Sequence, residues 1–246
     1  MGSYSRAMSS IDYILTCRRS ITYEVWLRIH QEDLCQALGV HPSNKYQNDG
    51  GPGPREIAEL LRSYSSAPND DVITLADALA LNWLIAGTDA HAKNYGILIA
   101  AGRVRLAPLY DIASVLPYPR FDVNRIKLAM KVGDRYRMSE IRRGDWQRTA
   151  DQLQLDPDSL LARIRHMAEA IPDLSVEISA ELKHTGLAEP ILDRLVKRLG
   201  ARAFVFETDW TLRRAIPLQT KAIAARVARD LRQAACSATH VNDSTP

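Results

Sequence analysis

The sequence of 246 residues has few cysteines and no long apolar run, and each absence excludes a class of protein. Its three cysteines, Cys17, Cys35 and Cys236, are widely spaced and form no C-x-x-C pair, which argues against a disulfide scaffold or a zinc site. No apolar stretch approaches the ~20 residues that a membrane-spanning helix needs. Residues 1–20 place a short apolar patch before the basic residues, the reverse of a secretory signal, so we expect a cytoplasmic protein without a membrane partner.

The sequence also lacks a strong excess of charge of either sign. Lys and Arg together number 32 and Asp and Glu 29, which gives a formal net charge of +3. That excess is too small to imply nucleic-acid binding by itself. The hydrophobic share of 46% is that of an ordinary globular protein, and the length suffices for one large domain or a domain with an appendage.

The clearest predicted element is a buried helix that ends at Gly87. Residues 69–87, NDDVITLADALALNWLIAG, carry apolar side chains nearly all round the helix, and Asp70 or Asp71 can cap its start. Pro172 is expected to interrupt a later helical region. The other expected elements are a weak strand over 21–29, a helix or turn over 30–39, helices over 54–64, 139–153, 157–170, 173–184 and 189–199, and a basic amphipathic helix over 217–236.

A short β-hairpin is predicted directly after the buried helix. Residues 97–99 form one strand and residues 103–107 the other, with the turn at Ala101 and Gly102. Because paired positions in a two-residue hairpin then sum to 203, Asp111 lies opposite residue 92. The carboxylate of Asp111 is therefore expected beside the loop that precedes the hairpin.

That loop, GTDAHAKNYG (87–96), concentrates polar groups. With Asp111 it offers the carboxylate and amide oxygens that Mg²⁺ prefers. Protein kinases use an Asp, an Asn five residues later, and a second Asp after a short hairpin. The same separation joins Asp89 to Asn94. We therefore predict Asp89 as the catalytic base, and Asn94 and Asp111 as Mg²⁺ ligands.

The loop differs from the H-R-D-x-K pattern of ordinary protein kinases. Its D-x-H-x-x-N pattern resembles the catalytic loops of lipid kinases and small-molecule phosphotransferases, so it defines the reaction class better than the substrate. A solvated turn after a helix also contains such residues, but the buried helix and Asp111 favour a phosphotransferase. On its own, His91 fits a hydrogen-bonded loop histidine, and Lys93 fits either a surface charge or a group facing a phosphate.

Several long segments make a family resemblance specific. They are NWLIAGTDAHAKNYGILI, GRVRLAPLYDIASVLPY, RIKLAMKVGDRYRM and RIHQEDLCQALGVHPSNKYQNDGGPG. In their order along the chain, in which the last of these comes first, they resemble the C-terminal lobe of HipA-type serine/threonine kinases, the toxins of HipBA toxin–antitoxin pairs. The resemblance runs from about residue 28 to about residue 200. An N-terminal segment, 1–27, and a tail with the basic helix, 201–246, lie outside it.

The resemblance implies a mainly α (α+β) fold, a protein-kinase-like C-lobe with a short catalytic hairpin. It implies ATP and Mg²⁺ as cofactors, Asp89 as the catalytic aspartate, and Asn94 and Asp111 as metal ligands. It places His91 and Lys93 near the phosphates, as catalytic and cofactor-binding groups. The implied partners are a small HipB-like DNA-binding antitoxin and a protein acceptor, which in well-known members is glutamate–tRNA ligase, an aminoacyl-tRNA synthetase.

One departure from the family concerns the N-lobe. Family members carry there a phosphate-covering loop, an ATP-contacting lysine and an adenine-gripping hinge, but only 27 residues precede Arg28 and they contain no Gly-rich loop. We therefore expect the N-lobe to be largely missing, as in a split, truncated or frame-shifted gene. Since transfer needs both the metal aspartate and the ATP lysine, we expect weak or no transfer by this polypeptide alone. The alternatives are a non-catalytic remnant that binds an antitoxin or another protein, and a kinase of lipids or small molecules, which the D-x-H-x-x-N pattern alone suggests.

Overall fold

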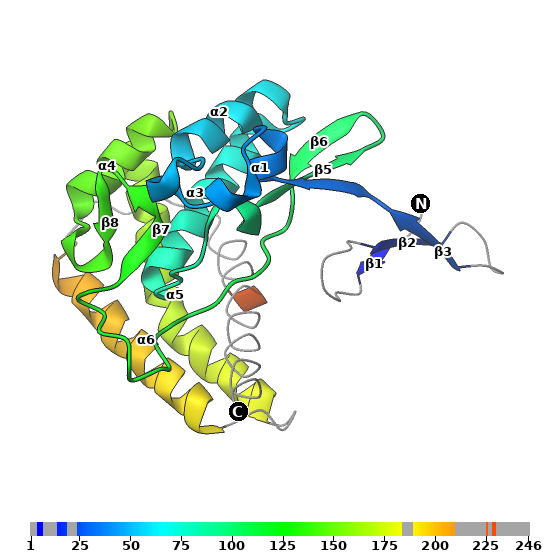
Figure 1. Ribbon diagram of the computed structural model, residues 1–246. Helices are drawn as coiled ribbons and strands as arrows, with labels where there is room; N and C mark the ends of the chain where they lie inside the picture. The colour runs from blue at the N-terminus through cyan, green and yellow to red at the C-terminus, as the bar shows by residue number, and fades with distance from the viewer. Residues whose placement is uncertain are drawn as a thin grey trace.

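The structure is a computed structural model that describes the backbone of residues 4–6, 14–18, 24–183, 189–209, 225 and 228–229. Side chains are described for residues 29–183, 190–202, 225, 228 and 229. Within these ranges the chain is mainly helical with small antiparallel sheets (Figure 1). The expectation of a mainly α, α+β fold is confirmed. No helix in the described part is both long enough and apolar enough to cross a membrane.

The longer helices pack around α3, which carries the core. Among the described residues they are α2 (Pro54–Tyr64), α3 (Pro68–Leu84), α4 (Arg143–Gln152), α5 (Pro157–Lys183) and α6 (Glu189–Asp209). The predicted burial of α3 is confirmed, because Leu75 and Ala80 on different sides of this helix are both fully buried. A helix that is apolar all round has no face for solvent and must lie inside the domain.

The predicted N-cap of α3 was wrong, because the helix begins earlier. Pro68 occupies its first turn and Ala67 is the N-cap residue. Asp71 is instead buried, and its carboxylate accepts hydrogen bonds from Ser65 Oγ at 2.5 Å and Arg105 Nη2 at 2.9 Å. This carboxylate therefore ties α3 to the hairpin that follows it.

Helix α5 runs without a break through Pro172, so the predicted interruption there was wrong. The missing N–H of proline removes one intrahelical hydrogen bond. Packing compensates, because Ile171 and Ile178 on either side are buried. Ser175 Oγ donates to the Pro172 carbonyl at 2.7 Å, which satisfies one backbone acceptor at this point.

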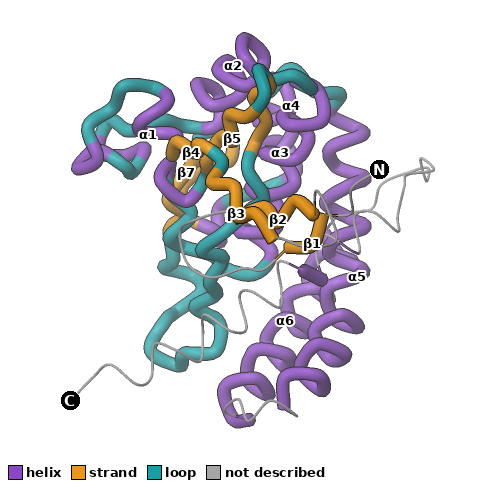
Figure 2. The backbone as a smooth tube through the Cα atoms, turned by 90° about the vertical axis from the view of Figure 1, so that its right-hand side faces the viewer, coloured by secondary structure: helices purple, strands orange, loops and turns teal. Residues whose placement is uncertain are grey.

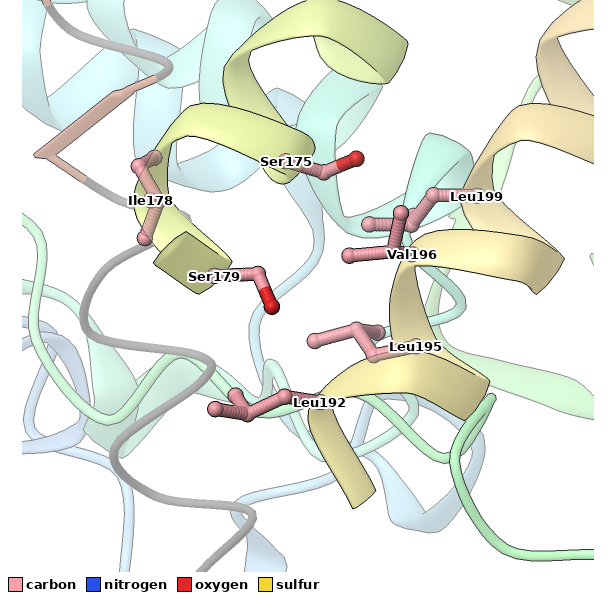
Figure 3. A pocket seen from close by; sticks show the side chains of 7 residues that line it. All are labelled: Ser175, Ile178, Ser179, Leu192, Leu195, Val196 and Leu199. Atoms are coloured by element: carbon pink, nitrogen blue, oxygen red, sulfur yellow. The ribbon is translucent and has the colours of Figure 1, made fainter. Parts of the chain in front are cut away.

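Helices α5 and α6 lie side by side as an antiparallel pair (Figures 1 and 2). Figure 3 shows Ser175 and Ser179 of α5 facing leucine side chains of α6 across a cavity of about 10 Å³. A cavity of this size is at the lower limit for one water molecule. Helix α6 also runs further than predicted, to Asp209. The helix predicted over 217–236 falls largely outside the described residues.

Three sheets are present in the described part of the chain. The first contains β1 (Tyr4–Arg6), β2 (Ile14–Arg18) and β3 (Glu24–Arg28); the second contains β4 (His30–Asp33), β5 (Gly96–Ala100) and β6 (Arg103–Leu106); the third contains β7 (Lys127–Val132) and β8 (Arg135–Arg137). The predicted strand over 21–29 corresponds to β3, whereas β1 and β2 were not predicted. Short elements complete the structure: α1 (Leu34–Ala37), η1 (Pro42–Asn44), η2 (Gln47–Asp49), η3 (Ala92–Asn94) and η4 (Met138–Glu140).

The predicted hairpin is confirmed in its register. Ile97 pairs with Leu106, and Ala100 pairs with Arg103, as a two-residue turn requires. The helix or turn expected over 30–39 is corrected, because residues 30–33 form β4, which pairs with β5, and only the four residues of α1 are helical. The strand forms because β5 offers it a partner from far along the chain, which local propensity does not indicate.

The ion pair between Asp77 on α3 and Arg163 on α5 should be essential for stability. Arg163 Nε and Nη2 donate to the two carboxylate oxygens at 2.7 and 2.6 Å, and both side chains are largely buried. We expect Asp77→Ala to lower the free energy of unfolding by about 3–5 kcal/mol, because it leaves a buried guanidinium without its carboxylate. Urea denaturation of the full chain measures this change.

The exposed pair of Arg55 and Glu59 supplies the control. Arg55→Ala should leave the free energy of unfolding almost unchanged, because both side chains lie in water. The double variant Asp77→Leu/Arg163→Met should recover most of the loss, since apolar replacement of both partners removes the unpaired charge. A double variant no more stable than Asp77→Ala would contradict the electrostatic explanation.

Candidate active site

The end of α3 positions the loop of residues 87–96. Ala86 has a positive φ of 56°, and Gly87 follows it. A Cβ atom on Gly87 would lie 2.2 Å from Asn82 Oδ1 and 3.1 Å from the carbonyl oxygen of Ala113. Only glycine therefore allows the start of this loop to pack against both the helix and the segment after Asp111.

The segment of residues 110–115 binds the loop and the end of α3 at three points. Tyr110 Oη donates to the carbonyl of Lys93 at 2.7 Å. Ser114 Oγ donates to the carbonyl of Ile85 at 2.6 Å, and Val115 N donates to the carbonyl of Ala86 at 3.2 Å. The segment that carries Asp111 is therefore held beside the loop by its own hydrogen bonds.

The segment from β4 to η2 lines the other side of the loop. Leu34 N donates to the carbonyl of Tyr95, and Ala92 N donates to the carbonyl of Lys45. A Cβ atom on Gly51 would lie 2.2 Å from the carbonyl oxygen of Asn44, so the GGPG sequence is a compact turn in this packing. This turn helps to fix the chain beside the loop.

The carboxylate of Asp89 is exposed but oriented. Tyr46 Oη donates to its Oδ1 at 2.6 Å, and His91 Nε2 lies 3.8 Å from the same atom. The Asp89 side chain is 58% exposed, so it faces solvent on the surface of the loop. The hydrogen bond to Asp89 raises the pKa of Tyr46 to about 12, with burial a second cause. Tyr46 therefore remains a hydrogen-bond donor at neutral pH.

His91 lies beneath Asp89 and is buried. Its ring packs edge-on against Tyr46 with the centroids 5.0 Å apart, and its Nδ1 has no hydrogen-bond partner. Burial lowers the pKa of His91, Lys45 lowers it further, and the negative charges of Asp89 and Asp111 oppose this shift. The imidazole is therefore neutral at pH 7, and it supports the tyrosine and the carboxylate rather than contacting solvent.

Asn94 and Asp111 offer oxygen donors from the two sides of the site. The Nδ2 of Asn94 donates to the Asp89 carbonyl at 2.7 Å, which leaves its Oδ1 as the donor atom for a cation. Asp111 is exposed and has a positive φ of 54°, an uncommon backbone conformation that occurs at functional sites. One amide oxygen and one carboxylate fit Mg²⁺, which binds few protein oxygens together with substrate phosphates. No group of three or more His, Cys, Asp or Glu side chains suited to a metal ion occurs in the part of the chain that is described.

Lys93 lies between the loop and β4. Its Nζ is 4.0 Å from Asp33 Oδ2, a long ion pair, and its side chain is 39% exposed. This ion pair therefore holds the ammonium group of Lys93 only weakly in its present position.

The structure brings the predicted residues into one region. Asp89, His91, Lys93 and Asn94 share the loop, and Asp111 follows a tyrosine bound to the carbonyl of Lys93. Tyr46, the hydrogen-bond partner of Asp89, was not predicted from the sequence. Its only signal was its position in a loop rich in turn-forming residues, because the partner lies 43 residues further along the chain.

The mainly helical fold with this hairpin is that of a protein-kinase-like C-terminal lobe. A family model described as the HipA-like C-terminal domain matches residues 13–174. Because this match covers more than half of the chain, the chain belongs to the family of HipA-like C-terminal domains.

Named relatives agree with the family. A putative kinase, Y4mE, of Sinorhizobium fredii (strain NBRC 101917 / NGR234) is 39% identical over 72% of this chain and 41% of its own length. The serine/threonine-protein kinase toxin HipA of Shewanella oneidensis (strain MR-1) is 29% identical over 62% of this chain and 37% of its own length. The chain therefore spans about two fifths of the length of these relatives.

Comparison with solved structures supports the fold. A chain from the Shewanella oneidensis MR-1 complex of HipA, HipB and operator DNA matches 100% of this chain and 54% of its own length, with a TM-score of 0.53. Its sequence identity to this chain is 18%, so the likeness concerns the fold alone.

The close packing of Gly87 should make this position intolerant of any side chain. We expect Gly87→Ala to destabilise the protein by about 1–3 kcal/mol, because the added methyl group overlaps Asn82 and the Ala113 backbone. The control is Gly200→Ala in α6, where nothing lies within 4 Å of the added atom; it should stabilise by about 0.5–1 kcal/mol, as alanine does in a helix. Denaturant unfolding compares the two, and an equal effect would refute the packing argument.

The hydrogen bond between Tyr46 and Asp89 should be visible in the titration of the tyrosine. The pKa of Tyr46 is raised, so the stability linked to it is present below pH 10 and is lost as the pH rises towards 12. In Asp89→Asn the pKa of Tyr46 should fall towards 10, because the carboxylate no longer favours the protonated phenol. NMR of ¹³C-labelled tyrosine rings measures this, with Tyr46→Phe to assign the signal. An unchanged pKa in Asp89→Asn would rule out the contact.

Proposed function

We propose that this chain supplies the C-terminal-lobe part of an ATP- and Mg²⁺-dependent serine/threonine protein kinase of the toxin–antitoxin type. The observation that carries the proposal is the exposed Asp89 carboxylate, oriented by Tyr46, in a loop that also holds Asn94 and is bonded to the Asp111 segment. These residues have the order and spacing of the catalytic groups of kinases.

Asp89 is proposed as the group that receives the proton of the attacking hydroxyl. Tyr46 and His91 both approach Oδ1, so Oδ2 is the oxygen that would accept the proton. A carboxylate fixed by one hydrogen bond keeps its other oxygen in a defined direction, which favours proton transfer in the correct geometry. Neutral His91 packs beneath Tyr46 and limits its movement.

Asn94 and Asp111 are proposed to hold Mg²⁺, which when bound would neutralise charge on the nucleotide phosphates. Lys93 is proposed to turn from Asp33 towards a phosphate, because its present ion pair is long and partly exposed. Exposed pairs contribute at most about 1 kcal/mol, so this movement costs little.

The partners are proposed from the relatives. One relative is named a kinase toxin, and the matched structure contains HipB and operator DNA. We propose a HipB-like antitoxin as a partner and a protein, of the aminoacyl-tRNA synthetase type, as the phosphate acceptor.

Binding of a metal ion tests the proposed site without requiring transfer. Titration with Mn²⁺, a paramagnetic substitute for Mg²⁺, in the presence of ATP should broaden the NMR signals of Tyr110 and Asn94. The broadening should be lost in Asp111→Asn and retained in Asp134→Asn, a matched control whose carboxylate is exposed outside the site. Equal broadening in the two variants would contradict the assignment of Asp111.

Transfer of radiolabelled phosphate tests the role of Asp89. Asp89→Asn should lower the transfer rate of the protein by about 10²–10⁴-fold, the contribution of a positioned general base. Asp158→Asn, an exposed carboxylate at the start of α5, serves as control and should leave the rate unchanged. Transfer that persists undiminished in Asp89→Asn would refute the assignment.

A further inference from the structure

A cavity of about 820 Å³ lies away from the candidate active site, between the start of α4, the second half of α6 and the chain that follows Asp111. In Figure 1 the orange end of α6 lies just below α4 and β8. This volume falls within the range of sites that bind ligands of moderate size. Neither the catalytic loop nor Asp111 lines it, so the proposed phosphoryl transfer does not account for it.

The charged residues around this cavity are all basic within the described part of the chain. Arg142 and Arg143 come from the start of α4, and Arg198 and Arg202 come from α6. No Asp or Glu occurs among the described residues that line the cavity. Four guanidinium groups around one hollow repel one another unless an anion lies between them, which points to an acidic ligand.

Several of these guanidinium groups have few acidic neighbours. Arg198 makes no hydrogen bond or ion pair with any described residue. Arg143 has a buried Nε without a partner, and its Nη2 lies 3.9 Å from the exposed carboxylate of Asp158. Arg142 Nη1 donates to the backbone carbonyl of Ser139 at 2.7 Å. Hydrogen-bonding capacity for a carboxylate therefore remains on both sides of the cavity.

Arg202 places a further charge in poorly solvated surroundings. Its Nε and Nη2 donate to the carbonyls of Leu84 and Trp83, both at 2.9 Å, at the end of α3. Burial lowers the pKa of Arg202 to about 10. A carboxylate brought close to this group would restore part of the solvation that the guanidinium has lost.

The start of α4 adds a backbone contribution. Arg143 is its first residue, and Gly144, the second, lines the cavity. The first N–H groups of α4 lie at the positive end of the helix dipole, where the Arg142 N–H already donates to the Asp145 carboxylate at 2.8 Å. Gly144 has no side chain to shield them, and a Cβ atom there would meet only the end of Arg148, at 4.0 Å.

The floor of the cavity is apolar. Leu116, Met138 and Ile141 line it, and each is at least nine-tenths buried. The protein itself already covers these side chains, so a ligand meets mainly the four arginines. Arginines spread around about 820 Å³ are more than one small inorganic anion can contact, whereas a peptide with several carboxylates can reach those of both helices.

We propose that this cavity is a docking site for an acidic segment of a partner protein. Its carboxylates pair with Arg142 at the start of α4 and with Arg198 on α6. Leu116 lies five residues after Asp111, so the segment docks beside the chain that leads out of the candidate active site. The proposal concerns binding, so it does not rest on the proposed phosphoryl transfer.

Fluorescence anisotropy with a fluorescein-labelled octapeptide of alternating glutamate and leucine tests the proposal on the full chain. The peptide should bind, and its affinity should fall with added salt, as charge pairing requires. Arg198→Glu and Arg142→Glu should each weaken binding by about tenfold or more. The control is Arg103→Glu, with the same change of charge at an exposed position on β6; it should leave the affinity unchanged.

Three results would overturn the docking site. The first is equal affinity in Arg198→Glu, Arg142→Glu and Arg103→Glu. The second is equal binding of a peptide with lysine in place of glutamate. The third is complete displacement of the peptide by inorganic phosphate at the same concentration, which would indicate a site for small anions. Circular dichroism of each variant checks that the chain has folded, and Arg142→Glu retains the test if Arg198→Glu does not fold.

Discussion

The close contact between Gly87 and the chain that follows Asp111 is the constraint on which the candidate site depends. No Cβ atom fits at Gly87 between Asn82 and the Ala113 backbone, so the end of α3 and the 110–115 segment can meet. Ser114 and Val115 then donate hydrogen bonds to the two residues that directly follow α3, and Tyr110 donates one to the loop. Without this contact the carboxylates of Asp89 and Asp111 would lie on separate surfaces of the protein.

Buried ionic groups connect this site to the rest of the fold. Asp71 joins the start of α3 to the hairpin through Arg105, and Asp77 joins the middle of α3 to α5 through Arg163. If one partner of such a buried ion pair is missing, the other charge stays buried without compensation, and the fold loses stability. These pairs therefore specify the arrangement of α3 more than they add to stability. Both ion pairs therefore fix helix α3 along its length, up to the point where the loop of residues 87–96 begins. A site that depends on close packing needs a rigid support of this kind.

The site and the arginine-lined cavity share the segment that leaves Asp111. Ser114 and Val115 in this segment donate to the two residues that follow α3, and Leu116, the next residue, lines the cavity. A ligand in the cavity would thus contact the same stretch of chain that positions Asp111. Two binding surfaces joined by one short segment provide a physical connection through which occupation of one could affect the other.

The sequence alone determined the buried helix, the hairpin with its register, and the residues Asp89, Asn94 and Asp111 in kinase-like order. These follow from local periodicity, turn chemistry and spacing, which act over a few residues. Tertiary structure decided the rest. Residues 30–33 became a strand because β5 was available, α5 continued through Pro172 because α6 packs beside it, and Tyr46 met Asp89 from 43 residues away. Partners so distant leave no local pattern, so only the folded chain reveals them.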